Sequence, residues 1–320
     1  MKAVAPLTRV LEHVYAPEAD TQAWLEGIRR AAGRAFDGHL DAQAYLLRMQ
    51  ESRFELERVA SDARYAAAIA DSHTAGADPR VINAYRAGGP VMRARDLYRR
   101  IGASHPTRAM AIRAGVMDVV GCVGFADPSR VCVISFVLAD EQTRFSRAAR
   151  LALSRLSAHL AASHRLRLRA GDVDEAVLTP DGALLDASGD AKDRGSRERL
   201  RQAAIRTVRA KRESAHDPAA SLAFWTAMVD GRWTLVERVD TDGKRLLIAK
   251  RNQPDSIADS ALTERERIVV ERASLGGSVR HVAYELGLAE STVSETVSRA
   301  LKKLGIRTRA ELIELRASLA

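Results

Sequence analysis

Polar and basic residues recur at helical spacing between residues 290 and 304. Ser294, Glu295, Ser298, Arg299 and Lys302 fall on one face of a helix with a period of 3.6 residues. Serine and glutamate can hydrogen-bond to base edges in the DNA major groove, where glutamate accepts from the amino group of cytosine. Arginine and lysine can neutralise phosphates. If this helix lies in the major groove of double-stranded DNA, these are the side chains that meet base edges and phosphates.

The opposite face of the same helix is apolar. Its members recur every three to four residues and are Val293, Val297, Ala300, Leu301 and Leu304. Such a stripe is typical of a helix that packs on a core. The preceding helix is predicted from Ser278, which can cap it, to Gly287, which ends it. Two helices of about eight and fifteen residues, joined by a tight turn with glycine, predict a helix-turn-helix whose second helix enters the major groove.

Two further helices flank this pair. Thr263 can cap the first, Glu266 completes a capping box three residues later, and Gly276-Gly277 ends the helix. The last helix is predicted from Ala310 to Leu319. Four short helices within residues 261–320 predict an all-α domain, although a plain helical bundle would give the same periodicity.

This segment resembles the LuxR-type (GerE, NarL-like) DNA-binding domain over almost all of its sixty residues. The matching positions are Leu262-Thr263-Glu264-Arg265-Glu266, Gly276-Gly277, Val282-Ala283, Leu286-Gly287, Glu290-Ser291-Thr292-Val293, Val297, Leu301, Lys303-Leu304-Gly305-Ile306 and Arg309-Ala310-Glu311-Leu312. The resemblance implies a four-helix domain that binds DNA as a dimer through its last helix.

The resemblance also implies which further residues meet DNA. Arg280 stands where the family has a lysine that contacts phosphate. Thr292 belongs to the matching run at the start of the DNA-reading helix. Lys303 is expected to join Arg299 and Lys302 in neutralising the DNA backbone.

Two features of the segment depart from a strong DNA binder. Ser294 stands where the family often has Lys or Arg. Residues 261–320 contain ten Lys or Arg against eight Asp or Glu, a net charge of +2. Because this surplus is small, we expect one domain to bind DNA weakly and a homodimer to bind usefully.

The rest of the chain predicts an α+β multidomain protein. Strands are expected at 40–49 and 54–60, and again at 117–125 and 130–139, followed by a long helix from Phe145 to Arg169 with its leucines inward, Leu151 among them. This order resembles a GAF domain from Ala19 to Arg169, so residues 1–170 are predicted to form a GAF-like sensor and dimerisation domain. Asp78-Pro79 is interpreted as a helix start rather than a ligand contact.

A second, smaller α+β domain is predicted over residues 171–255. Strand pairs at 176–185 and 233–250 enclose helices predicted at 196–213 and 219–229, and the order resembles a PAS module. Asn252 to Ser256 is predicted to be the linker into the DNA-binding domain, residues 256–320. Between Arg144 and Arg212 sixteen Lys or Arg face eight Asp or Glu. A solvated helix face is the preferred interpretation of that surplus, and non-specific contact with phosphates is the alternative.

Composition and motifs exclude several classes of protein. No apolar run reaches the eighteen residues of a membrane span and no signal-peptide core is present, so the cytoplasm is expected. Cys122 and Cys132 are interpreted as small buried side chains near one another across a hairpin. No nucleophile–base motif, phosphate-binding loop or metal-ligand spacing occurs, so neither an enzyme nor a metal site is expected. His159, His164 and His216 lack haem-like spacing; no cofactor is evident, and a small-molecule ligand of a sensor domain stays open.

The sequence therefore predicts a transcriptional regulator whose N-terminal sensors control a dimeric helix-turn-helix, with RNA polymerase as a further candidate partner. Two alternatives remain. Residues 292–304 also resemble region 4 of sigma factors, which would bind promoter DNA only together with RNA polymerase. A ligand-binding scaffold with a silent helix-turn-helix would not bind DNA at all.

Overall fold

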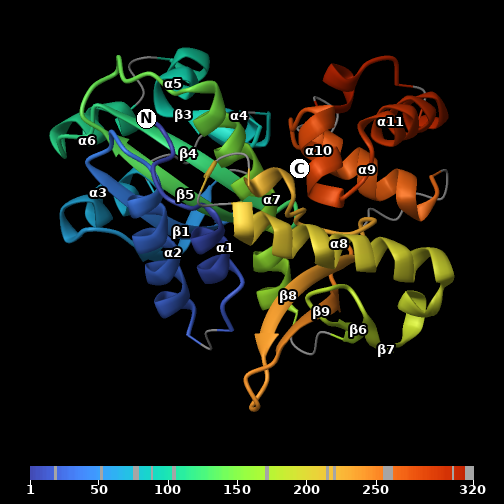
Figure 1. Ribbon diagram of the computed structural model, residues 1–320. Helices are drawn as coiled ribbons and strands as arrows, with labels where there is room; N and C mark the ends of the chain where they lie inside the picture. The colour runs from blue at the N-terminus through green and yellow to red at the C-terminus, as the bar shows by residue number, and fades with distance from the viewer. Residues whose placement is uncertain are drawn as a thin grey trace.

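Two antiparallel sheets and a separate group of helices make up the chain (Figure 1). The computed structural model describes residues 1–17, 20–50, 53–74, 79–87, 89–102, 106–169, 173–213, 216–218, 221–254, 262–304 and 306–313. We call residues 262–313 the head and the described residues up to 254 the body. Within the described residues, no helix is long and apolar enough to cross a membrane.

The first sheet has the strand order β2-β1-β5-β4-β3. Its strands are β1 (Asp41–Met49), β2 (Phe54–Ala60), β3 (Val91–Arg93), β4 (Asp118–Phe125) and β5 (Arg130–Leu138). Helices α1 (Thr8–Val14), α2 (Thr21–Ala35) and α7 (Arg147–Leu168) pack on one face, whereas α3 (Ala63–Thr74), α4 (Pro79–Ala87), α5 (Ala94–Ile101) and α6 (Pro106–Arg113) lie toward the other.

Both faces of this sheet are therefore buried. Ile134 of β5 joins the core under α2 and α7, and its neighbour Val133 joins the core on the opposite face. This double burial explains why β5 is apolar apart from Arg130 and Ser135, instead of alternating between apolar and polar residues. The two predicted strand pairs and the long helix are confirmed. Leu151, predicted to face inward on α7, is 37% exposed, so that expectation is wrong.

The second sheet has the order β7-β6-β9-β8, built from β6 (Asp174–Leu178), β7 (Leu184–Ala187), β8 (Trp233–Val239) and β9 (Arg245–Arg251). As in the first sheet, the first strand of the first hairpin pairs with the last strand of the second. Helix α8 (Arg194–Glu213) covers one face, where Leu200 and Ala204 pack with Trp233.

The helix predicted at 219–229 is wrong. The described part of that segment contains only a short 3-10 turn, Ser221–Ala223, before an irregular chain. Trp225, Met228 and Val229 enter three different cores, so no single helical stripe could bury all three. The predicted linker also fails where it is described, because Asn252 is fully buried and donates to the Ala162 carbonyl at 2.8 Å. Residues 255–261 lie outside the described part.

The head contains α9 (Glu264–Ser274), α10 (Val279–Leu286) and α11 (Glu290–Leu304). Residues 309–313 are helical as well, and the rest of the predicted last helix lies outside the described residues. In Figure 1, α10 lies toward the body, and α11 lies on the side of the head away from the first sheet. The capping box predicted for α9 is present, with the Thr263 side chain and the Glu266 side chain each accepting the other's backbone amide.

Candidate nucleic-acid interface

Helix α11 has one buried and one exposed face, as its pattern predicts. Val293, Ala300 and Leu301 are buried against α9 and α10, together with Val297. Ser294, Glu295, Ser298, Arg299 and Lys302 are all exposed. No other described segment of the chain forms an ion pair with Glu295, Arg299 or Lys302, so these three charges are available to a partner. Contact of this face with DNA stays a prediction.

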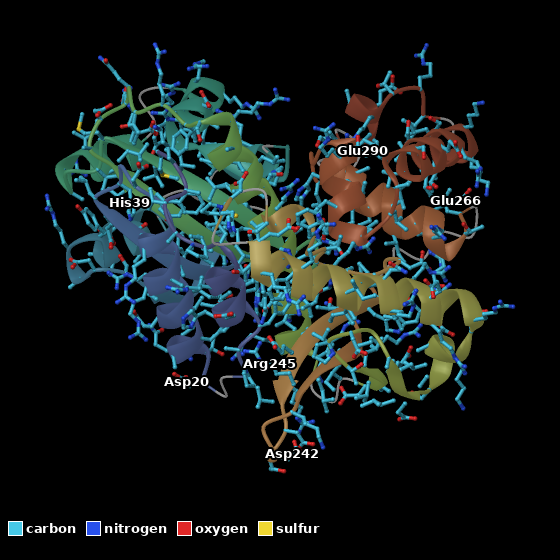
Figure 2. All side chains as sticks on the ribbon, in the orientation of Figure 1. Asp20, His39, Asp242, Arg245, Glu266 and Glu290 are labelled. Atoms are coloured by element: carbon cyan, nitrogen blue, oxygen red, sulfur yellow. The ribbon has the colours of Figure 1, made fainter. Side chains whose placement is uncertain are left out.

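Lys303 lies differently from its neighbours. Its ammonium is 2.7 Å from Oε2 of Glu266, the carboxylate of the α9 capping box. This ion pair, with the hydrogen bonds from Thr263, lowers the pKa of Glu266 to about 2. Lys303 therefore joins the end of α11 to the start of α9, and a phosphate would have to compete with Glu266 for it. Figure 2 shows Glu266 at the opposite end of the head from Glu290.

Arg280 is also engaged within the head. Its Nε donates to Oε1 of Glu290 at 2.9 Å, and 65% of its side chain is exposed. The pair bridges the first turns of α10 and α11. Thr292 is half-buried on α11, where its carbonyl accepts from the Thr296 hydroxyl at 2.6 Å. The structure thus brings Arg280 and Thr292 near the N-terminal ends of the helix pair and places Lys303 at the far end.

The head meets the body through the turn between α10 and α11. Gly287 ends α10 in the left-handed region with φ +66°, and a Cβ there would stand 2.1 Å from the Met228 carbonyl oxygen. Only glycine permits both the backbone angle and this approach. The amide of Gly231 donates to the Leu286 carbonyl across the same contact. The turn of the predicted helix-turn-helix is therefore also a contact between the head and the body.

A cluster of buried charges lies beneath this turn. Glu285 stands 3.4 Å from Arg272 and 3.7 Å from Arg165 of α7. Arg272 also donates to the carbonyls of Phe125 and Ala126, at 2.7 and 3.1 Å. Burial, and then the charge of Arg272, lower the pKa of Arg165, although its guanidinium stays charged at neutral pH. Such a cluster favours one position of the docked head, because a head shifted along the body would leave charges buried without their partners.

Tyr284 links the head to two body segments, the one that contains Leu222 and Trp225 and helix α7. Its hydroxyl donates to the carbonyls of Leu222 and Trp225 and lies 2.8 Å from Nε2 of His159. Nδ1 of His159 lies 2.8 Å from the Tyr15 hydroxyl. Burial lowers the pKa of His159 to about 3, so the imidazole is neutral and its two nitrogens serve this hydrogen-bond network. His159 is thus a core histidine whose two ring nitrogens both have hydrogen-bond partners.

These docking residues were not predicted from the sequence, although the positions of two of them indicate a buried charge. Arg272 occupies a place in the apolar stripe of α9, where a charged residue needs a buried partner. Arg165 is similarly buried within α7. Their shared partner, Glu285, comes from α10, so no local spacing connects the three residues.

The match to a known protein family lies in the head. Residues 260–315 match the family described as bacterial regulatory proteins, luxR family. The probable HTH-type transcriptional regulator GfsR of Streptomyces halstedii is 38% identical over 78 residues, which are 24% of this chain and 30% of that protein. The glycerol metabolism activator of Pseudomonas putida is 42% identical over 53 residues, 17% of this chain and 24% of that protein.

The stretches matched by the two regulators cover 24% and 17% of this chain. The matched stretches span less than a third of the length of either regulator. A solved structure of Escherichia coli SdiA aligns over 96% of this chain and 92% of its own, but at 12% identity and a TM-score of 0.29 it supports no argument. The GAF-like and PAS-like resemblances stay predictions. What the matching residues and the arrangement of α9, α10 and α11 do establish is that this chain carries at its C-terminal end a helix-turn-helix domain of the luxR family of bacterial regulatory proteins.

Proposed function

We propose that the protein is a transcriptional regulator that reads double-stranded DNA with α11, as a homodimer, under the control of its body. The observation that carries this proposal is the exposed polar face of α11, which no described part of the body covers. The head docks through α9, α10 and Gly287 instead, on the side away from that face. Two heads at a fixed spacing would compensate for the few basic residues on each.

Residues 1–170, 171–255 and 256–320 are proposed as the first sensor, second sensor and DNA-binding domains. A cavity of about 130 Å³ between the first sheet and helices α3 to α6 supports the sensor role. Tyr45, Tyr65, Tyr85 and Tyr98 line it among mainly apolar side chains. Because ligand pockets usually have about 300 Å³ or more, a larger ligand would have to displace the covering helices. Such a displacement would be the signal.

The proposal is tested by selecting preferred sites from random duplexes with the full-length protein. We expect Arg299→Ala with Lys302→Ala to weaken binding to every sequence and to reduce the salt slope by about two, one for each phosphate contact. Glu295→Ala or a change at Ser294 should instead shift the preferred site, because these residues face base edges. An unchanged site with Glu295→Ala would refute the groove assignment.

The same experiment separates the alternatives. A sigma-factor-like protein would bind only after RNA polymerase is added, and a scaffold would select no sequence. Native mass spectrometry of the protein as purified tests the homodimer and reveals any bound small molecule.

A further inference from the structure

An open groove of about 550 Å³ runs between the head and helices α7 and α8. Three arginines from three separate elements line it: Arg155 of α7, Arg206 of α8 and Arg280 of α10. Ser278 and Glu290, at the beginnings of α10 and α11, line the same groove. Body and head thus both contribute positive charge to one concave surface.

The three arginines differ in how tightly they are held. Arg206 is exposed, and the described residues provide it with no ion pair. Arg155 lies over the ring of Tyr284, 5.6 Å from its centroid, and burial and the nearby Arg280 lower its pKa while Asp217 opposes the change. Arg280 is paired with Glu290. Three positive side chains against Glu290, with Asp217 near Arg155, leave a local surplus of positive charge.

The position of the groove identifies what would fill it. In a helix-turn-helix the N-terminal part of the second helix meets base edges, while the first helix crosses the DNA backbone. The beginnings of both helices line this groove, so it continues directly from the end of α11 that would lie nearest to the bases. A DNA backbone that continues past this end of α11 would next meet Arg280 and then the two arginines of the body.

We infer that Arg155 and Arg206 form, with Arg280, a second phosphate-binding site that holds the DNA backbone flanking the sequence read by α11. This inference rests on the proposed function and extends it. The body supplies phosphate contacts of its own, and the docked head is the state that assembles them. Non-specific affinity therefore depends on the position of the head on the body, and Glu290 opposes the approaching phosphate.

The test uses the full-length protein and the variant Arg206→Gln. Arg197→Gln is the matched control, because Arg197 is exposed on the same helix, has no ion pair among the described residues and does not line the groove. It lies nine residues earlier, about 13 Å along the helix axis. Binding to a labelled duplex with the selected site is measured by fluorescence anisotropy from 50 to 300 mM KCl.

Arg206→Gln should weaken binding up to about fivefold at low salt and lower the salt slope by about 0.9, the loss of one phosphate contact. Arg197→Gln should leave both quantities near their wild-type values. Glu290→Gln should strengthen binding. On a duplex trimmed to the site that α11 reads, Arg206→Gln should have no effect, because the flanking backbone is absent.

If Arg206→Gln and Arg197→Gln show equal salt slopes of binding on the long duplex, the inference is overturned. The inference about the groove then fails alone if the wild type still selects a sequence and the double variant Arg299→Ala, Lys302→Ala still weakens binding. If the wild type selects no sequence, the proposed function itself fails. A loss of transcription with Arg206→Gln at unchanged DNA affinity would assign the groove to a protein partner and also overturn the inference.

Discussion

Replacing Glu285 by glutamine tests whether the buried charges hold the head on the body. The side chain is 6% exposed and lies within 3.7 Å of both Arg165 and Arg272. Glutamine keeps the shape of the side chain and removes the negative charge that lies between the two guanidinium groups. Breaking a buried ion pair from one side costs about 3–5 kcal/mol. Because the Phe125 and Ala126 carbonyls still accept from these arginines, we expect the lower value, about 3 kcal/mol.

Urea unfolding measures this loss. With a slope of about 2 kcal/mol per molar, a loss of about 3 kcal/mol lowers the midpoint by about 1.5 M. The three tryptophans, Trp24, Trp225 and Trp233, all lie in the body, so their fluorescence reports the body while far-UV circular dichroism reports every helix. We expect the dichroism transition to move to lower urea and to separate from the fluorescence transition, because the head is released first.

The matched control is Glu295→Gln on the exposed face of α11, which makes the same chemical change without a buried partner. Its effect should stay within about 0.5 kcal/mol. If Glu285→Gln shifts the midpoint no more than Glu295→Gln, the buried cluster does not hold the head, and the reasoning is refuted.

Two further predictions follow from the docking contacts. Gly287→Ala should destabilise the protein more than Gly243→Ala in thermal unfolding, because both have positive φ but only at Gly287 would a Cβ meet a backbone oxygen, at 2.1 Å; equal losses would contradict this. Stability should also fall from pH 7 to pH 4.5, since burial lowers the pKa of His159 to about 3 and that of His164 to about 4. The unfolded chain binds these protons below about pH 6.5 and the folded chain does not, so each histidine costs about 1.4 kcal/mol per pH unit, and a flat urea midpoint over this range would exclude the effect.

The local spacing of apolar residues was sufficient to predict a helix or strand wherever the segment is buried on one defined face or on both faces. The stripe of Val293, Val297 and Leu301 fixes both the helix and its orientation, because a period of 3.6 residues leaves one way to bury all three. The many Val, Ile and Phe residues of β5 predicted a strand, and the structure buries this strand on both faces. Capping residues predicted where helices begin and end: Thr263 caps the start of α9, and Gly287 ends α10.

The local sequence was insufficient to predict the role of a residue whose partner is distant in the chain. Lysine at position 303 suits a phosphate and the Glu266 carboxylate equally well, and only the fold brings Glu266 to 2.7 Å. The segment around Trp225 has helical spacing, yet three separate cores draw its side chains apart. In the sequence, the arginine surplus of α7 and α8 favours a solvated helix face. Only the position of the head shows that Arg155 and Arg206 face α10 across a groove.

The docked arrangement limits how a signal could act on DNA binding. Because the described body leaves the polar face of α11 exposed, the proposed signal would not act by uncovering the proposed DNA-reading surface. What the body does fix is the orientation of the head, through Gly287, the charges around Glu285 and the hydrogen bonds of Tyr284. His159 joins Tyr284 to Tyr15, so a displacement of the N-terminal helices against α7 would reach the head directly. Control by this route changes the spacing of two heads, and it therefore requires the dimer that the proposed function assumes.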